Sequence, residues 1–140
     1  MGYKSPHCYT LNLHATMLAA PSDAATYYFG GYITAPTTTP ANHRTLIPKD
    51  GRITRVQVTA FCIVGGNEAV EMDLRLNAAT DTVISTTGDM SASNVQWVNN
   101  NLDIPVTTAD YIMIKMICPT WAVLNPTNVF LNANVFIETE

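Results

Sequence analysis

The chain has 140 residues, and its net charge of −4 comes from 7 basic and 11 acidic residues. Charged residues make up 13% of the chain, about half of the usual share of roughly 25%. This composition excludes a coiled coil and a charge-driven disordered chain, and the acidic balance argues against nucleic-acid binding, which needs a basic face. The length fits one domain, which we expect to span residues 1–140.

The first half of the chain opens with an arm that we expect over residues 1–8. No secretion signal is recognisable there, because no apolar run follows the first residues. Apolar and polar side chains then alternate, as they do in strands with one buried face. Strands are predicted over residues 8–15, 26–34 and 45–47, and a Thr- and Pro-rich loop over residues 34–41.

The alternation is clearest over residues 53–64 and 69–77. The intervening Gly65-Gly66-Asn67 tolerates positive φ, so we predict a hairpin that joins these two strands. The second half of the first strand is apolar on both faces. We therefore expect it to be covered on both sides.

The second half of the chain continues the same pattern. Strands are predicted over residues 82–86, 95–98, 103–106, 111–118 and 129–138, and an apolar loop precedes the last one. No segment has a helical period, and no apolar run is long enough to span a membrane. With eight to ten strands and regular turn signals, the sequence predicts an all-β fold, an antiparallel, jelly-roll-like β-sandwich.

Residues that could carry chemistry are few. Glu71 and Asp73 alternate with apolar residues, so we place both carboxylates on the solvent face of their strand. The histidines are scattered, and no catalytic or metal-binding motif is present. We predict that the chain has no catalytic residues, no metal and no cofactor.

Cys8, Cys62 and Cys118 are odd in number and far apart, without the paired spacing of a zinc or redox motif. Each lies in an apolar stretch. We expect each to be a small buried apolar residue in a chain made in a reducing cytoplasm.

Four residues are candidate contacts with an oligomer or a partner: Trp97, Trp121, Arg44 and Arg52. Trp121 would pack one end of the sandwich, anchor an oligomer interface or form a platform for a sugar. The two arginines belong to a local basic excess with Lys49 and Arg55. These side chains would be solvated strand ends or would face an acidic partner.

Several short motifs follow one another in a distinctive order between about residues 9 and 138. They are YYFGG at 27–31, IPKDGRI at 47–53, GGNE at 65–68, LRLNAATD at 74–81, DYIMIK at 110–115 and WAVLNPTNV at 121–129. In this order they resemble the motifs of a group of short β-sandwich virion surface proteins from tailed bacteriophages and prophages.

The resemblance implies a tumour-necrosis-factor-like jelly roll, usually trimeric, that serves as a capsid decoration protein, a head fibre or a receptor-binding tip. The family pattern carries no catalytic residues. Long fibres need a coiled-coil or repetitive shaft, which this sequence lacks, whereas a short arm suits a cementing protein.

Our first hypothesis is therefore a non-enzymatic bacteriophage virion structural protein. It would be made in the host bacterial cytoplasm and would decorate the virion surface as a homotrimer on the major capsid protein or another virion protein. The alternative is a head- or tail-fibre tip, an adhesin that binds a glycan or a host receptor, with Asn99-Asn100-Asn101 as a candidate contact.

Overall fold

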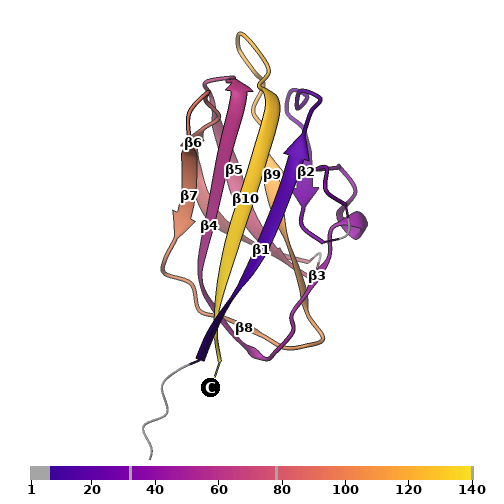
Figure 1. Cartoon of the computed structure of the whole chain (residues 1–140), viewed down its shortest axis with the longest axis vertical. Coiled ribbons are helices and arrows are strands. Elements are labelled where there is room, and N and C mark those ends of the chain that lie inside the picture. Colours follow the sequence, from indigo (N-terminus) through magenta and orange to yellow (C-terminus); the bar gives the residue numbers. More distant parts are fainter. Residues whose placement is uncertain (1–6, 32, 78, 140) are drawn as a thin grey trace, which may run out of the picture.

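The computed structural model describes residues 7–31, 33–77 and 79–139, and in these ranges it forms two antiparallel sheets packed face to face (Figure 1). Sheet A contains β1 (His7–Met17), β10 (Thr127–Thr139), β4 (Gly51–Val64) and β7 (Val95–Asn99), with β8 (Ile104–Val106) paired to the start of β4. Sheet B contains β2 (Thr26–Phe29), β9 (Tyr111–Ile117), β5 (Ala69–Leu76) and β6 (Thr80–Asp89), with β3 (Thr45–Leu46) beside β9. The predicted all-β antiparallel sandwich is confirmed.

The strand order is nested. Sheet A runs β1-β10-β4-β7 and sheet B runs β2-β9-β5-β6, so the first strand lies beside the last, and the second beside the one before the last. Such nesting of two four-stranded sheets is the jelly-roll arrangement. It places the start of β1 and the end of β10 together at one end of the sandwich (Figure 1).

The core between the sheets is built by alternation. Every second residue of the long strands turns inward, as the period of 2 requires. Large inward side chains that are fully buried include Leu13, Phe29, Ile53, Leu74, Trp97, Ile112 and Met116. Trp97 also joins the two sheets, because its Nε1 donates to the Val70 carbonyl oxygen at 2.7 Å.

The predicted hairpin between residues 53–64 and 69–77 is wrong. β4 belongs to sheet A and β5 to sheet B, so the chain crosses from one sheet to the other at Gly65-Gly66. Neither glycine has a positive φ. Each allows a close approach instead: a Cβ on Gly65 would lie 2.7 Å from the Ser91 backbone, and one on Gly66 would lie 2.6 Å from the Trp121 ring.

Strand ends otherwise differ from the predictions by up to three residues, with one exception. β2 ends at Phe29 instead of extending through residue 34, because Gly30 and Gly31 take φ values of 117° and 88° that no regular strand uses. Beyond it, the predicted loop contains a short 3-10 helix, η1 (Pro40–Asn42).

The expected N-terminal arm overlaps β1, since His7 and Cys8 already pair with β10. The rest of that arm lies outside the described residues. No helix in the described part of the chain is long and apolar enough to cross a membrane.

Candidate interaction surface

The outer face of sheet A presents amides and hydroxyls where a solvated sheet would present charges. Alternation turns Gln57 and Thr59 of β4 outward, and the register places Asn134 and Asn132 of β10 beside them. The neighbouring outward positions on β1 and β7 are Asn12, His14, Thr16, Gln96 and Val98. From the level of Gln57 to the ends of β1 and β4, this face carries no Asp, Glu, Lys or Arg.

Hydrogen bonds link these amides across the strands. The Asn12 Nδ2 donates to the Oδ1 atoms of Asn132 and Asn134, both at 2.8 Å. On the other side of β10, the Gln57 Nε2 donates to the Gln96 Oε1 at 3.1 Å. Cross-strand pairs of this kind hold the side chains in one arrangement, so the face offers a fixed pattern of donors and acceptors.

The strands β1 and β4 stop and β10 begins at the same end of the sandwich (Figure 1). Large apolar side chains are exposed there. Leu18 is 73% exposed, Ile63 56% and Val123 94%. Seven of the ten exposed large apolar residues of the described chain lie here, and we call them the apolar end: Leu18, Phe61, Ile63, Val64, Val123, Leu124 and Phe130. Single exposed apolar residues are ordinary, whereas a cluster marks an interaction surface.

The expectation that both faces of residues 58–64 are covered is therefore wrong for the single chain. Cys62 is buried toward sheet B, but Phe61 and Ile63 face water. The alternation correctly predicted that Phe61 and Ile63 point away from the core, but no other part of the described chain packs over them.

Phe61 and Phe130 lie opposite each other on β4 and β10 at the border between the amides and the apolar end. Their ring centroids are 6.3 Å apart and their planes meet at 29°. A shallow hollow of about 200 Å³ opens beside the rings, where Thr59, Asn94 and Asn132 form part of its wall. The rings offer apolar area and the amides offer directional hydrogen bonds, which is the composition of a protein interface core.

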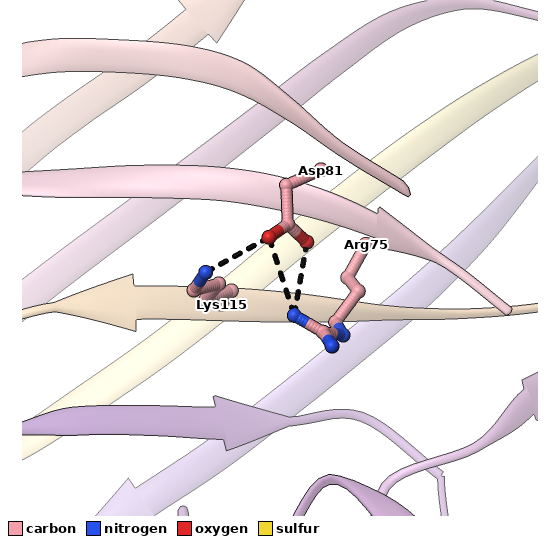
Figure 2. A network of polar contacts seen from close by, with 3 residues as sticks. All are labelled: Arg75, Asp81 and Lys115. Carbon is pink, nitrogen blue, oxygen red and sulfur yellow. Dashed lines mark hydrogen bonds and ion pairs between the residues drawn. The ribbon is translucent and has the colours of Figure 1, made fainter. Parts of the chain in front are cut away.

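The outer face of sheet B has the opposite character. Asp81 of β6 accepts a hydrogen bond from the Lys115 Nζ at 2.8 Å and two from the Arg75 Nη1 at 3.2 Å, as Figure 2 shows. The Arg75 guanidinium also lies 5.4 Å from the Tyr28 ring centroid. Charges on this face pair with one another and remain hydrated at their outer edges.

Asp73 corrects a further expectation, because its side chain is buried instead of lying on a solvated face. The register places it opposite Lys115, but that ammonium binds Asp81, and the Asp73 Oδ1 has no partner. Burial raises the pKa of Asp73 to about 6, and the nearby Glu71 carboxylate adds to the rise. Its neighbours Met72 and Leu74 both face the core, so Asp73 points to the outer face of sheet B as alternation predicts, and the surrounding side chains bury it there.

A larger open hollow of about 690 Å³ lies at the other end of the sandwich, where β4 begins. Lys49, Asp50, Arg52 and Glu138 are among the residues around it. The Arg52 Nε donates to the Asp103 Oδ1, and the Asp50 Oδ1 accepts from the Thr108 amide at 2.8 Å. Charges of both signs mix here, so the hollow favours no single class of ligand.

The four predicted contact residues are not brought together. Trp97 lies in the core, and Trp121 packs on Gly66 at the apolar end with its indole Nε1 buried and unpartnered. Arg52 lines the hollow at the opposite end, and the Arg44 guanidinium lies 4.7 Å from the centroid of the Tyr111 ring.

The basic excess is divided. Lys49 and Arg52 line the same hollow, whereas the Arg55 guanidinium lies 5.0 Å from the Phe136 ring centroid on sheet A. Phe61 and Phe130 were not among the predicted contacts. The signal that could have identified Phe61 was the two-sided apolar run that ends β4.

The three cysteines differ in burial. Cys62 and Cys118 are buried, and burial raises the pKa of the first thiol to about 11 and of the second to about 12. Both are inert apolar fillers at neutral pH, as expected. Cys8 is exposed on the outer face of β1, so the expectation is wrong for this residue.

Within the loop proposed for a receptor, Asn99 is engaged inside the chain. Its Nδ2 donates to the Val83 carbonyl oxygen at 3.1 Å, and its Oδ1 accepts from the Asn101 amide at 2.9 Å. Both polar atoms of the Asn99 side chain therefore make a hydrogen bond within the chain.

The chain was compared with protein families, curated proteins and solved structures, and only solved structures gave a match. No protein-family model matches the chain, and no curated protein matches it. Among solved structures, a chain from desmodium yellow mottle tymovirus is similar over 99% of this chain and 89% of that chain, with a TM-score of 0.36 and 13% sequence identity. Membership of the bacteriophage group suggested by the motifs is not shown by these comparisons.

Proposed function

We propose that the chain is a non-enzymatic structural protein of a bacteriophage virion, which decorates and cements the capsid surface as a homotrimer. The observation that carries the proposal is the uncharged part of the outer face of sheet A, from Gln57 onward, together with the apolar end. A single copy leaves this area in water, although burying apolar surface is favourable by about 25 cal/mol per Å². A clustered apolar surface depleted of charge supports a role in association.

The sequence supplies the second support. The motif order resembles that of phage virion sandwiches. The partner would be the major capsid protein, and the location the outside of the virion after synthesis in the host cytoplasm. No nucleic acid, membrane or cofactor is required.

The carboxylates support a non-enzymatic role. Paired acid–base carboxylates need access to a substrate in a cleft. Asp73 is buried in its strand, and Asp81 is held by Lys115 and Arg75. Neither lines the hollows described above. Asp50 and Glu138 do line the larger hollow, and there Asp50 accepts a hydrogen bond from the Thr108 amide at 2.8 Å.

The test compares virions made with and without this chain. A protein that binds only the assembled shell stabilises it by linkage, so virions that lack the chain should lose infectivity sooner on heating, chelation or osmotic shock. Adding the purified protein back should restore resistance. Equal resistance of both virions would contradict the cementing role, and antibody labelling confined to the tail tip would favour the fibre-tip alternative.

A further inference from the structure

We infer that the outer face of sheet A is the surface through which copies of this chain meet, with Phe61 and Phe130 at its centre and three copies turned toward a common axis. The inference rests on the proposed homotrimer and names the surface that forms it.

The size of the face suits this role. From Thr127 to Asn134, eight residues of β10 rise about 3.4 Å each, so across four strands about 4.8 Å apart the uncharged part of the face covers on the order of 500 Å². The exposed loop residues Leu18, Val123 and Leu124 of the apolar end enlarge this area. A stable interface needs about 800 Å² from each partner. That is about a tenth of the 7237 Å² that one chain exposes.

The absence of charge favours a second copy as the occupant. Close to a threefold axis each side chain lies near its two equivalents, so a charged residue there would meet like charges and destabilise the assembly. No Asp, Glu, Lys or Arg points outward from Gln57 to the apolar end. Recognition of a charged partner would need opposite charges on this same face.

The amides match a second copy equally well. Asn and Gln side chains each carry donors and acceptors, so a face built from them complements itself. The amides of Asn12, Asn132 and Asn134 are already ordered by their mutual hydrogen bonds, which lowers the entropy lost when copies meet.

The aromatic pair supplies the anchor. Phe61 and Phe130 are each 41% exposed, and their rings border a hollow of about 200 Å³ that can receive a side chain of the neighbouring copy. Aromatic residues at the centre of a patch carry a large share of the binding energy at interfaces. Arg55 and Glu138 lie toward the other end of the face, at its rim.

The experiment is light scattering on the full chain across a dilution series, with one matched pair of variants. Phe61→Lys places a charge on the outer face of sheet A. Val83→Lys places the same charge on sheet B, at a residue with similar exposure, 46%. We expect the wild type and Val83→Lys to have about three times the chain mass of 15.3 kDa, and Phe61→Lys to have the mass of one chain.

A second measurement covers the case in which Phe61→Lys does not fold. In a Cys8→Ser background, Thr59→Cys should give disulfide-linked dimers on mild oxidation, because equivalent residues meet near the axis. Val83→Cys should give none. A monomeric wild type, a Phe61→Lys variant that keeps the wild-type mass, or cross-linking of both cysteine variants would overturn the inference.

The two proposals can fail separately. If the wild type protects virions but Phe61→Lys keeps its mass, the capsid role stands and this interface is wrong. If Phe61→Lys dissociates while the wild type leaves virions unprotected, the interface stands and the capsid role is wrong.

Discussion

The outer faces of the two sheets are made by the same alternation, yet they differ in charge. Sheet B pairs Asp81 with Lys115 and Arg75 and keeps these groups in contact with water. Sheet A links amides to amides and ends in exposed Phe61 and Phe130. From Gln57 to the apolar end the outer face of sheet A carries no Asp, Glu, Lys or Arg. The difference teaches that the distribution of charge, more than its total, distinguishes the hydrated face of sheet B from the face of sheet A that we propose as an interface.

We expect the largest effect from changing Trp97, because this residue of sheet A donates a hydrogen bond to the Val70 carbonyl oxygen of sheet B. A Cβ on Gly88 would lie 2.2 Å from its ring, so the glycine makes room for the indole. We expect Trp97→Ala to lower the free energy of unfolding by about 3–5 kcal/mol through the cavity it leaves. Chemical denaturation followed by circular dichroism measures the loss.

Trp97→Phe serves as the graded control. It keeps an aromatic ring but loses the hydrogen bond from the Nε1 to the Val70 carbonyl oxygen, so we expect a smaller loss. If Trp97→Ala unfolds with the wild-type midpoint, the sheets are not held together at this residue.

Asp73 gives a second test of the comparison. It lies on the outer face of sheet B, but unlike the other charged residues there it is buried. Its pKa of about 6 lies above the ordinary value of 3.8, so the folded state holds the proton more tightly than the unfolded state does. The free energy of unfolding should therefore fall as the pH rises from about 4 to about 6. We expect Asp73→Asn to remove this fall and to be more stable than the wild type at pH 7 by about 1–3 kcal/mol.

Denaturation at a series of pH values between 4 and 7.5 tests this prediction. Glu71→Gln should flatten the profile in part, because the Glu71 charge is a smaller cause of the raised pKa than burial. A profile that is the same for Asp73→Asn and the wild type would show that Asp73 titrates as an exposed carboxyl does.

Asp81→Ala should have the smallest effect. Its partners Lys115 and Arg75 are partly exposed, and ion pairs at a surface contribute under about 1 kcal/mol. The loss should shrink further in 0.5 M salt because of screening, and the oligomer mass should stay unchanged. A change of mass on light scattering would place an interface on sheet B and contradict the comparison.

Most strand positions could be predicted because the period of 2 is local and continuous. The pairing of β4 could not, because a short Gly-rich connection serves a hairpin and a crossing between sheets equally well. The crossing fits the close packing of Gly65 on Ser91 and of Gly66 on Trp121, and these two partners lie in distant segments of the chain. The candidate site was predicted less well: alternation turned Phe61 outward, but no local pattern shows whether other parts of the chain cover it.

The sequence by itself determined an all-β chain, its strand positions and which side of each strand is apolar, since these depend on neighbours one or two residues away. Only the tertiary structure decided that β1 lies beside β10, that Asp73 is buried and that the uncharged residues of four strands form one face. Each of these depends on strands that are far apart in the chain, since His7 pairs with Thr139, Asp73 with Lys115 and Gln57 with Asn134. Their contacts arise from the packing of the whole sandwich, which alternation along one strand does not encode.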